Sequence, residues 1–179
     1  MPSLPNLPVP GLSRTDEDPS PDELMRIYLR RHLAAAGAGA ALFRRVASSV
    51  APDMRMRVAE LARDVEEDQQ SLLTISERYG TERPVIQEKV GAIAQQLGRL
   101  NPTGTAIRRS PLADVIELEA LGTAVQGKLL GFRTLRALAD DDPRLDPAEA
   151  DALCERAQDQ KERIEALRLE AVQRDKAAG

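Results

Sequence analysis

Apolar residues recur at alternating steps of three and four along residues 54–79, and this is the period of an α-helix packed along one stripe. The stripe consists of Met54, Val58, Leu61, Val65, Leu72, Ile75 and Tyr79. Gly80 follows it and is typical of a helix end. A second stripe contains Val115, Leu118, Gly122, Val125, Leu129 and Phe132. Aromatic residues make up only 2% of the chain, so aliphatic side chains must form the core, which favours an all-α fold.

Helix start signals mark three further boundaries. A capping residue is followed by proline at Ser20-Pro21, Ser110-Pro111 and Asp146-Pro147, and glutamate stands three residues after the first and last of these caps, at Glu23 and Glu149. These signals predict helices from Pro21 to about Val50, from Pro111 to about Ala139 and from Pro147 to about Lys176, in addition to the helix that ends at Gly80.

The connections between these helices predict how the bundle is wound. Short turns at 51–53 and 140–143 indicate two antiparallel hairpins. Residues 81–109 form a long connection with a shorter helix at about 85–100. Residues 1–19 are rich in proline, which predicts a disordered or extended tail ahead of a helical domain at 20–176. An alternative is that the apolar residues of this tail form a polyproline-type strip that docks on a partner.

The predicted helix order resembles that of the ferritin-like superfamily, in which two long hairpins are joined by one long crossover. This resemblance implies a four-helix bundle over about 21–176 and, in the oxidases of the superfamily, a di-iron site built from carboxylates and two Glu-x-x-His pairs. The chain has one histidine, His32, and no such pair. A standard di-iron centre is therefore not expected, and neither a metal nor another cofactor is predicted.

Polar residues interrupt the apolar stripes near the middle of the bundle. His32 replaces a core residue in the first helix, Asp68 does so in the second and Gln160 in the last. Hairpin geometry places His32 near the level of Asp68, and Gln126 across from Gln160. The sequence thus suggests a buried polar layer of His32, Asp68, Gln126 and Gln160, with Glu119 as a further candidate.

Three interpretations of this layer remain open. In the first, Asp68 accepts a hydrogen bond from His32 and the glutamines complete a network that fixes the helix register. In the second, the layer is a degenerate metal or small-ligand site. In the third, one or more of these side chains point to solvent.

Small residues fill 34–41 of the first helix, and Gly122, Gly127 and Gly131 follow in the third. Glycine inside a helix costs about 1 kcal/mol relative to alanine, so its presence suggests close packing in return. Either another helix of the same chain approaches closely here, or the small residues form a subunit interface.

Charge and composition narrow the possible functions. A net charge of −4 and a pI near 5.2 do not favour nucleic-acid binding, and the arginine pairs are expected on solvated helix faces. A single cysteine and the absence of a signal or membrane-spanning pattern predict a cytoplasmic protein without a membrane partner. No nucleophile arrangement or phosphate-binding loop is visible. The expected function is non-catalytic, through self-association as a homo-oligomer or through a protein partner; the alternative is a metal-binding ferritin-like oxidoreductase or storage protein.

Overall fold

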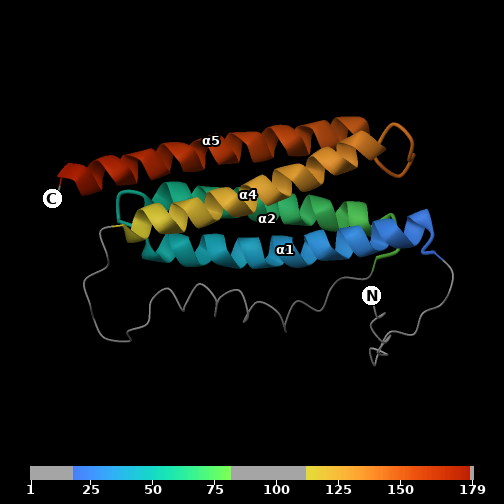
Figure 1. Ribbon diagram of the computed structural model, residues 1–179, viewed down its shortest axis with the longest axis horizontal. Helices are drawn as coiled ribbons and strands as arrows, with labels where there is room; N and C mark the ends of the chain where they lie inside the picture. The colour runs from blue at the N-terminus through green and yellow to red at the C-terminus, as the bar shows by residue number, and fades with distance from the viewer. Residues whose placement is uncertain (1–17, 82–111, 178–179) are drawn as a thin grey trace, which may run out of the picture.

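The computed structural model describes residues 18–81 and 112–177, and within these ranges the chain forms four helices. They are α1 (Pro21–Ser49), α2 (Arg55–Glu77), α4 (Ala113–Leu138) and α5 (Pro147–Ala177) (Figure 1). The expected all-α four-helix bundle is confirmed. The helix expected at 85–100, the cap at Ser110 and the tail up to residue 17 lie outside the described residues.

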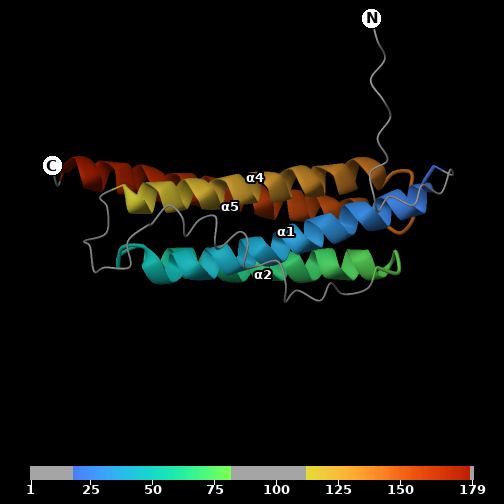
Figure 2. The same ribbon diagram turned by 60° about the horizontal axis from the view of Figure 1, so that its bottom comes forward.

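The four helices form two antiparallel hairpins, α1 with α2 and α4 with α5 (Figure 1, Figure 2). Both views show α1 and α5 running in one direction, and α2 and α4 in the other. The end of α2 and the start of α4 therefore lie at opposite ends of the bundle. The hairpins meet where α1 packs on α4 and α2 packs on α5, and these contacts are less extensive than those within each hairpin.

Side-chain caps fix where α1 and α5 begin, and a glycine follows the end of α2. The Ser20 hydroxyl accepts a hydrogen bond from the Glu23 amide at 3.2 Å, and the Asp146 carboxylate accepts one from the Ala148 amide at 2.9 Å. Both caps satisfy backbone donors that a helix start leaves unpaired. Gly80, just after α2, has a φ of 64°, which glycine adopts without the steric cost of a side chain.

The buried side chains form two apolar clusters, one toward each end of the bundle. The first contains Phe43, Val46, Met54, Val58, Leu61, Val65, Leu118, Leu121, Val125, Ile164 and Leu167, among others. The second contains Leu29, Leu33, Leu72, Ile75, Tyr79, Leu129, Phe132, Leu135 and Leu153, among others. On α2 the first cluster ends at Val65 and the second begins at Leu72, so Asp68 lies between them.

Charged and polar side chains join α2 to α5 at intervals of seven residues. The pairs are Arg57 with Glu170, Asp64 with Arg163, Ser71 with Arg156, and Arg78 with Glu149. A seven-residue repeat keeps one side of each helix turned toward its neighbour, as in a coiled coil. Exposed ion pairs contribute little free energy, so this polar ladder acts mainly on the register of α5 against α2.

Two glycines allow a direct test of how closely the helices pack. A Cβ at Gly39 would meet no atom within 4 Å, whereas a Cβ at Gly131 would lie 2.7 Å from the His32 ring. We expect Gly39→Ala to stabilise the bundle by about 0.5–1 kcal/mol, because alanine is the better helix former. We expect Gly131→Ala to destabilise it by about 1–3 kcal/mol through overpacking.

Urea unfolding followed by circular dichroism would measure both changes. The added variant His32→Ala should make Gly131→Ala tolerable, because it removes the ring that the new methyl group meets. Equal effects of alanine at both glycines, or no recovery in the double variant, would contradict the packing described here.

Candidate functional site: a buried polar layer beside an apolar pocket

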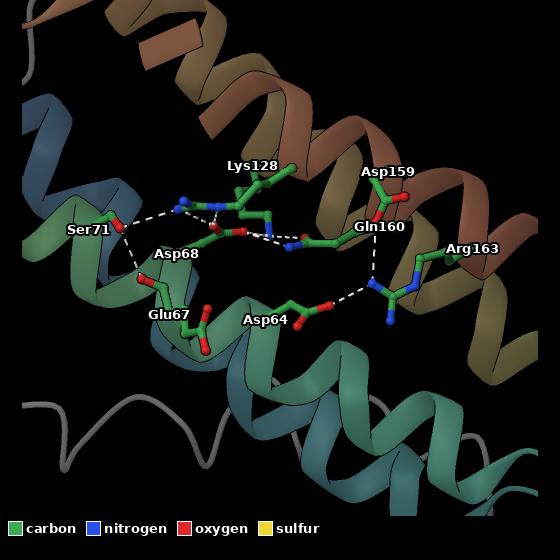
Figure 3. Close-up of polar contacts among 9 residues, drawn as sticks. Asp64, Glu67, Asp68, Ser71, Lys128, Asp159, Gln160 and Arg163 are labelled. Carbon is green, nitrogen blue, oxygen red and sulfur yellow. Dashed lines mark hydrogen bonds and ion pairs between the residues drawn. The ribbon is translucent and has the colours of Figure 1, made fainter. Parts of the chain in front are cut away.

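Asp68 is the centre of a polar layer in the middle of the bundle (Figure 3). Its carboxylate is fully buried on α2 and faces the other hairpin. One oxygen accepts hydrogen bonds from Lys128 Nζ at 2.6 Å and from Gln160 Nε2 at 2.8 Å. The second oxygen accepts from Arg156 Nε at 2.8 Å. Three donors from α4 and α5 thus hold one carboxylate from α2.

Lys128 and Gln160 also bond to each other, which closes the network. The Lys128 ammonium donates to Gln160 Oε1, so the glutamine amide uses both its donor and its acceptor inside the layer. Gln160 is buried, and the Lys128 side chain is only 14% exposed. Arg156, more exposed, extends the network to Ser71 at 3.3 Å. We name Asp68, Lys128, Gln160 and Arg156 the polar layer.

The charges of the polar layer do not cancel. One carboxylate faces the ammonium of Lys128 and the guanidinium of Arg156, which leaves one net positive charge. Burial lowers the pKa of Lys128 below its usual value, and the Asp68 carboxylate opposes that shift. The Asp64 carboxylate also acts on Lys128, so this count of charge covers only the three groups that are bonded to one another.

An apolar pocket of about 340 Å³ lies against this layer, lined by residues of α1, α2 and α4. Lys128 and Asp68 contribute to its lining, together with many apolar side chains. Small residues from two helices make the space: Ala35, Ala38 and Gly39 of α1, and Thr123, Ala124 and Gly127 of α4. A Cβ at Gly39 or at Gly127 would meet nothing within 4 Å.

These small residues correct one expectation from the sequence. Close approach of another helix was one of the two interpretations of the small residues, but at Gly39 and Gly127 the helices leave open space. At Gly131 the close approach does occur, because the His32 ring fills the place of the missing side chain. The small residues therefore form a pocket in one part of the α1–α4 contact and a tight fit in another.

His32 lies near Gly131 and does not take part in the hydrogen bonds of the polar layer. The centroid of its half-buried ring lies 4.4 Å from that of Tyr28, with the two rings tilted by 46°, and burial lowers the pKa of His32. Within the described residues no hydrogen bond joins His32 to Asp68, so the bond of the first interpretation is not formed. The reason is direction: Asp68 faces α4 and α5, whereas His32 packs against α4 beside Gly131. Both residues nevertheless line the same pocket.

The remaining two predicted residues lie apart from the hydrogen-bonded network. Gln126 is half-buried on α4, two positions before Lys128, and two positions turn the chain to a different side of a helix. The Glu119 side chain is 57% exposed and lies 3.8 Å from Arg168. Glu119 is therefore a surface residue and not part of a buried layer.

Lys128 and Arg156 are the members of the layer that the sequence analysis missed. A signal for Lys128 was present, because Leu121, Val125, Lys128, Phe132 and Leu135 follow one another at alternating steps of four and three. Lys128 thus occupies a stripe position in α4 in the same way as Asp68 does in α2. Arg156 gave no such signal, because it belongs to the partly exposed ladder between α2 and α5.

A second, more polar hollow lies on the α2–α5 side of the layer. Its volume is about 400 Å³, and its lining consists of Asp64, Glu67, Glu155, Arg156, Asp159 and Gln160. Gln160 and Arg156 thus line this hollow, while Lys128 lines the apolar pocket and Asp68 bonds to all three.

The polar layer does not have the chemistry of a metal site. Across 18–81 and 112–177 no three His, Cys, Asp or Glu side chains are grouped so that they could hold a metal ion. The oxygens of Asp68 already face an ammonium, a guanidinium and an amide, and the two cations would repel a metal ion.

Two further findings bear on function. None of the described helices combines the length and apolar composition needed to cross a bilayer. Comparisons with protein-family models, curated proteins and solved structures give no match. The geometry of the residues themselves must therefore suggest the function.

Proposed function

We propose that this protein is a non-catalytic, ferritin-like helical bundle that acts by self-association through the outer face of α4. The ferritin-like part of the proposal is supported by the helix directions, since two antiparallel hairpins with α2 parallel to α4 require a connection along the bundle (Figure 1). The self-association part is carried by one observation, an uncharged and exposed stripe along α4.

This stripe, which we name the α4 seam, runs along the exposed side of α4, and two of its residues, Thr123 and Gly127, also line the apolar pocket. Its residues are Ile116, Ala120, Thr123, Gly127, Leu130, Thr134 and Ala137, at alternating steps of four and three. All are exposed except Ala120, which is half-buried, and the side chains of Ile116 and Leu130 are large apolar groups exposed by 50% and 53%. Because α4 is apolar on its core side as well, it has the composition of a helix covered on both sides.

The α4 seam fits a second copy of itself in antiparallel orientation. With the two-fold axis at Gly127, Ile116 of one chain lies opposite Ala137 of the other, and Thr123 lies opposite Leu130. Large and small residues thus alternate across the contact, and the two Gly127 positions meet at the centre, where the helices can approach most closely. A two-fold interface of this kind uses the same surface on both chains.

Charges beside the α4 seam favour the same orientation. Glu119 and Arg133 lie along one edge of the seam, on its N-terminal and C-terminal halves. In an antiparallel helix pair the equivalent edges face each other, so Glu119 of each chain would lie opposite Arg133 of the other. A parallel pair would lack this match. Opposite charges at such positions favour one orientation over its alternatives.

Sedimentation equilibrium of the full chain tests this proposal. We expect a dimer for the wild type and a monomer for Leu130→Asp, with the dissociation constant raised at least about 100-fold, because two apolar contacts are lost and two charges are buried. Leu169→Asp is the matched control, since Leu169 is an equally exposed leucine on α5, outside the seam. Circular dichroism would establish that both variants remain helical.

A charge reversal tests the antiparallel orientation separately. Glu119→Arg and Arg133→Glu should each weaken the dimer by placing like charges together, and the double variant should restore it. A monomeric wild type would overturn the proposal of self-association and leave a different protein partner as the candidate. A dimer that survives Leu130→Asp would place the interface elsewhere.

A further inference from the structure

The apolar pocket has one polar donor that the polar layer does not use completely. The Lys128 ammonium carries three hydrogens, and its acceptors within the described residues are Asp68 and Gln160. One hydrogen is therefore available to an acceptor in the pocket that Lys128 lines.

The charge of the layer determines which acceptor suits this position. Asp68 already receives three donors, and Arg156 lines the opposite hollow together with four carboxylates. Lys128 is the ammonium that lines the apolar pocket. An anionic oxygen in the pocket would accept a charge-assisted hydrogen bond from Lys128, which is stronger than a bond to a neutral oxygen. A cation would find only carboxylate oxygens that are already occupied.

The rest of the pocket determines what is attached to that anionic group. Its walls are mainly aliphatic and aromatic carbon from Leu42, Phe43, Val65, Leu72 and Leu135, together with the small residues of α1 and α4. A volume of about 340 Å³ is at the lower end of the range for small-molecule sites. Apolar walls with a few placed polar groups are typical of such sites.

We propose that this pocket binds a small aliphatic monocarboxylate, with its carboxylate on Lys128 and its hydrocarbon body between α1, α2 and α4. The pocket borders the α4 seam, because Thr123 and Gly127 belong to both, whereas Lys128 and Gly39 lie outside the seam. A ligand of this kind would link α4 to α2 across the contact between the hairpins, next to the layer where Asp68 already joins them.

Gly39 offers a way to close the pocket without disturbing the polar layer. It lines the pocket, and a side chain placed there would enter open space. Gly39→Leu should therefore fill part of the cavity and leave the helix intact. Ala34→Leu is the matched control, because Ala34 is an exposed residue of the same helix and does not line the pocket.

Isothermal titration calorimetry with decanoate and with decanol tests the proposal. We expect the wild type and Ala34→Leu to bind decanoate about tenfold more tightly than decanol, and Gly39→Leu to lose at least about tenfold in affinity for both. Lys128→Gln should bind the two compounds about equally, because the amide lacks the charge. Octanoate and palmitate would measure the length that the pocket accepts.

Each outcome bears on the proposal. No binding of any of the carboxylates to the wild type would overturn it, as would equal affinity of the wild type and Gly39→Leu. Equal affinity of the wild type for decanoate and decanol would refute the role of Lys128. If Lys128→Gln fails to fold, the affinities of the wild type and Gly39→Leu for decanoate still show whether the pocket is the binding site. Sedimentation equilibrium of the wild type without decanoate measures self-association by itself, so failure of the dimer proposal and failure of this one are distinguishable.

Discussion

Replacing Asp68 with alanine is expected to destabilise the bundle by about 3–5 kcal/mol, because the change leaves the cations of the polar layer without their shared carboxylate. Lys128 would remain largely buried with only the amide of Gln160 as a partner, and Arg156 would lose its inner acceptor. Urea unfolding at neutral pH, followed by circular dichroism, would measure the change as a shift in the midpoint at constant slope.

Two further variants separate the loss of a buried charge from the loss of an ion pair as such. Asp64→Ala, one turn away on the same helix, removes a partly exposed pair with Arg163 and should cost less than about 1 kcal/mol. The double variant Asp68→Leu with Lys128→Met replaces both central charges by apolar groups of similar size and should recover most of the lost stability. Similar losses for Asp68→Ala and Asp64→Ala would contradict the importance of burial.

The sequence was sufficient to predict the helices and part of the polar layer. Stripes and capping residues are local signals, so the start of α1 at Pro21 and of α5 at Pro147 could be read directly. Asp68 and Gln160 were found because each interrupts an apolar stripe, and a polar residue in a stripe must be buried with its partners.

His32 shows why the same reasoning gave a wrong bond. The length of a hairpin gives the level at which two residues lie, but it does not give the direction in which each side chain points around its helix. Asp68 points toward α4 and α5, where two cations and an amide meet it, and His32 fits against Gly131. Directions of this kind depend on which helices are neighbours.

The ladder between α2 and α5 and the seam of α4 were missed for a related reason. The seven-residue spacing of Arg57, Asp64, Ser71 and Arg78 is visible in the sequence, but it has a meaning only when α5 is known to be the facing helix. The apolar residues of the α4 seam were likewise hidden by the stronger core stripe of the same helix. Only the assembled bundle shows that one stripe is buried and that the other is exposed.

Replacing Phe43 with alanine is the second change expected to have a large effect, a loss of about 3–5 kcal/mol in the free energy of unfolding. Phe43 is among the largest fully buried side chains, and it packs in the apolar cluster that includes Val46 and Leu118.

The position of Phe43 beside the pocket makes the size of this loss informative. Because Phe43 lines the pocket, its removal would enlarge an existing cavity, and the surrounding helices would have to collapse further to close it. Phe43→Leu should cost clearly less, and Met56→Ala, at a side chain that is 72% exposed, should change stability by less than about 0.5 kcal/mol. Thermal unfolding of the three variants would measure these losses in stability. A loss for Phe43→Ala near that of Met56→Ala would mean that this wall of the pocket is not packed as described.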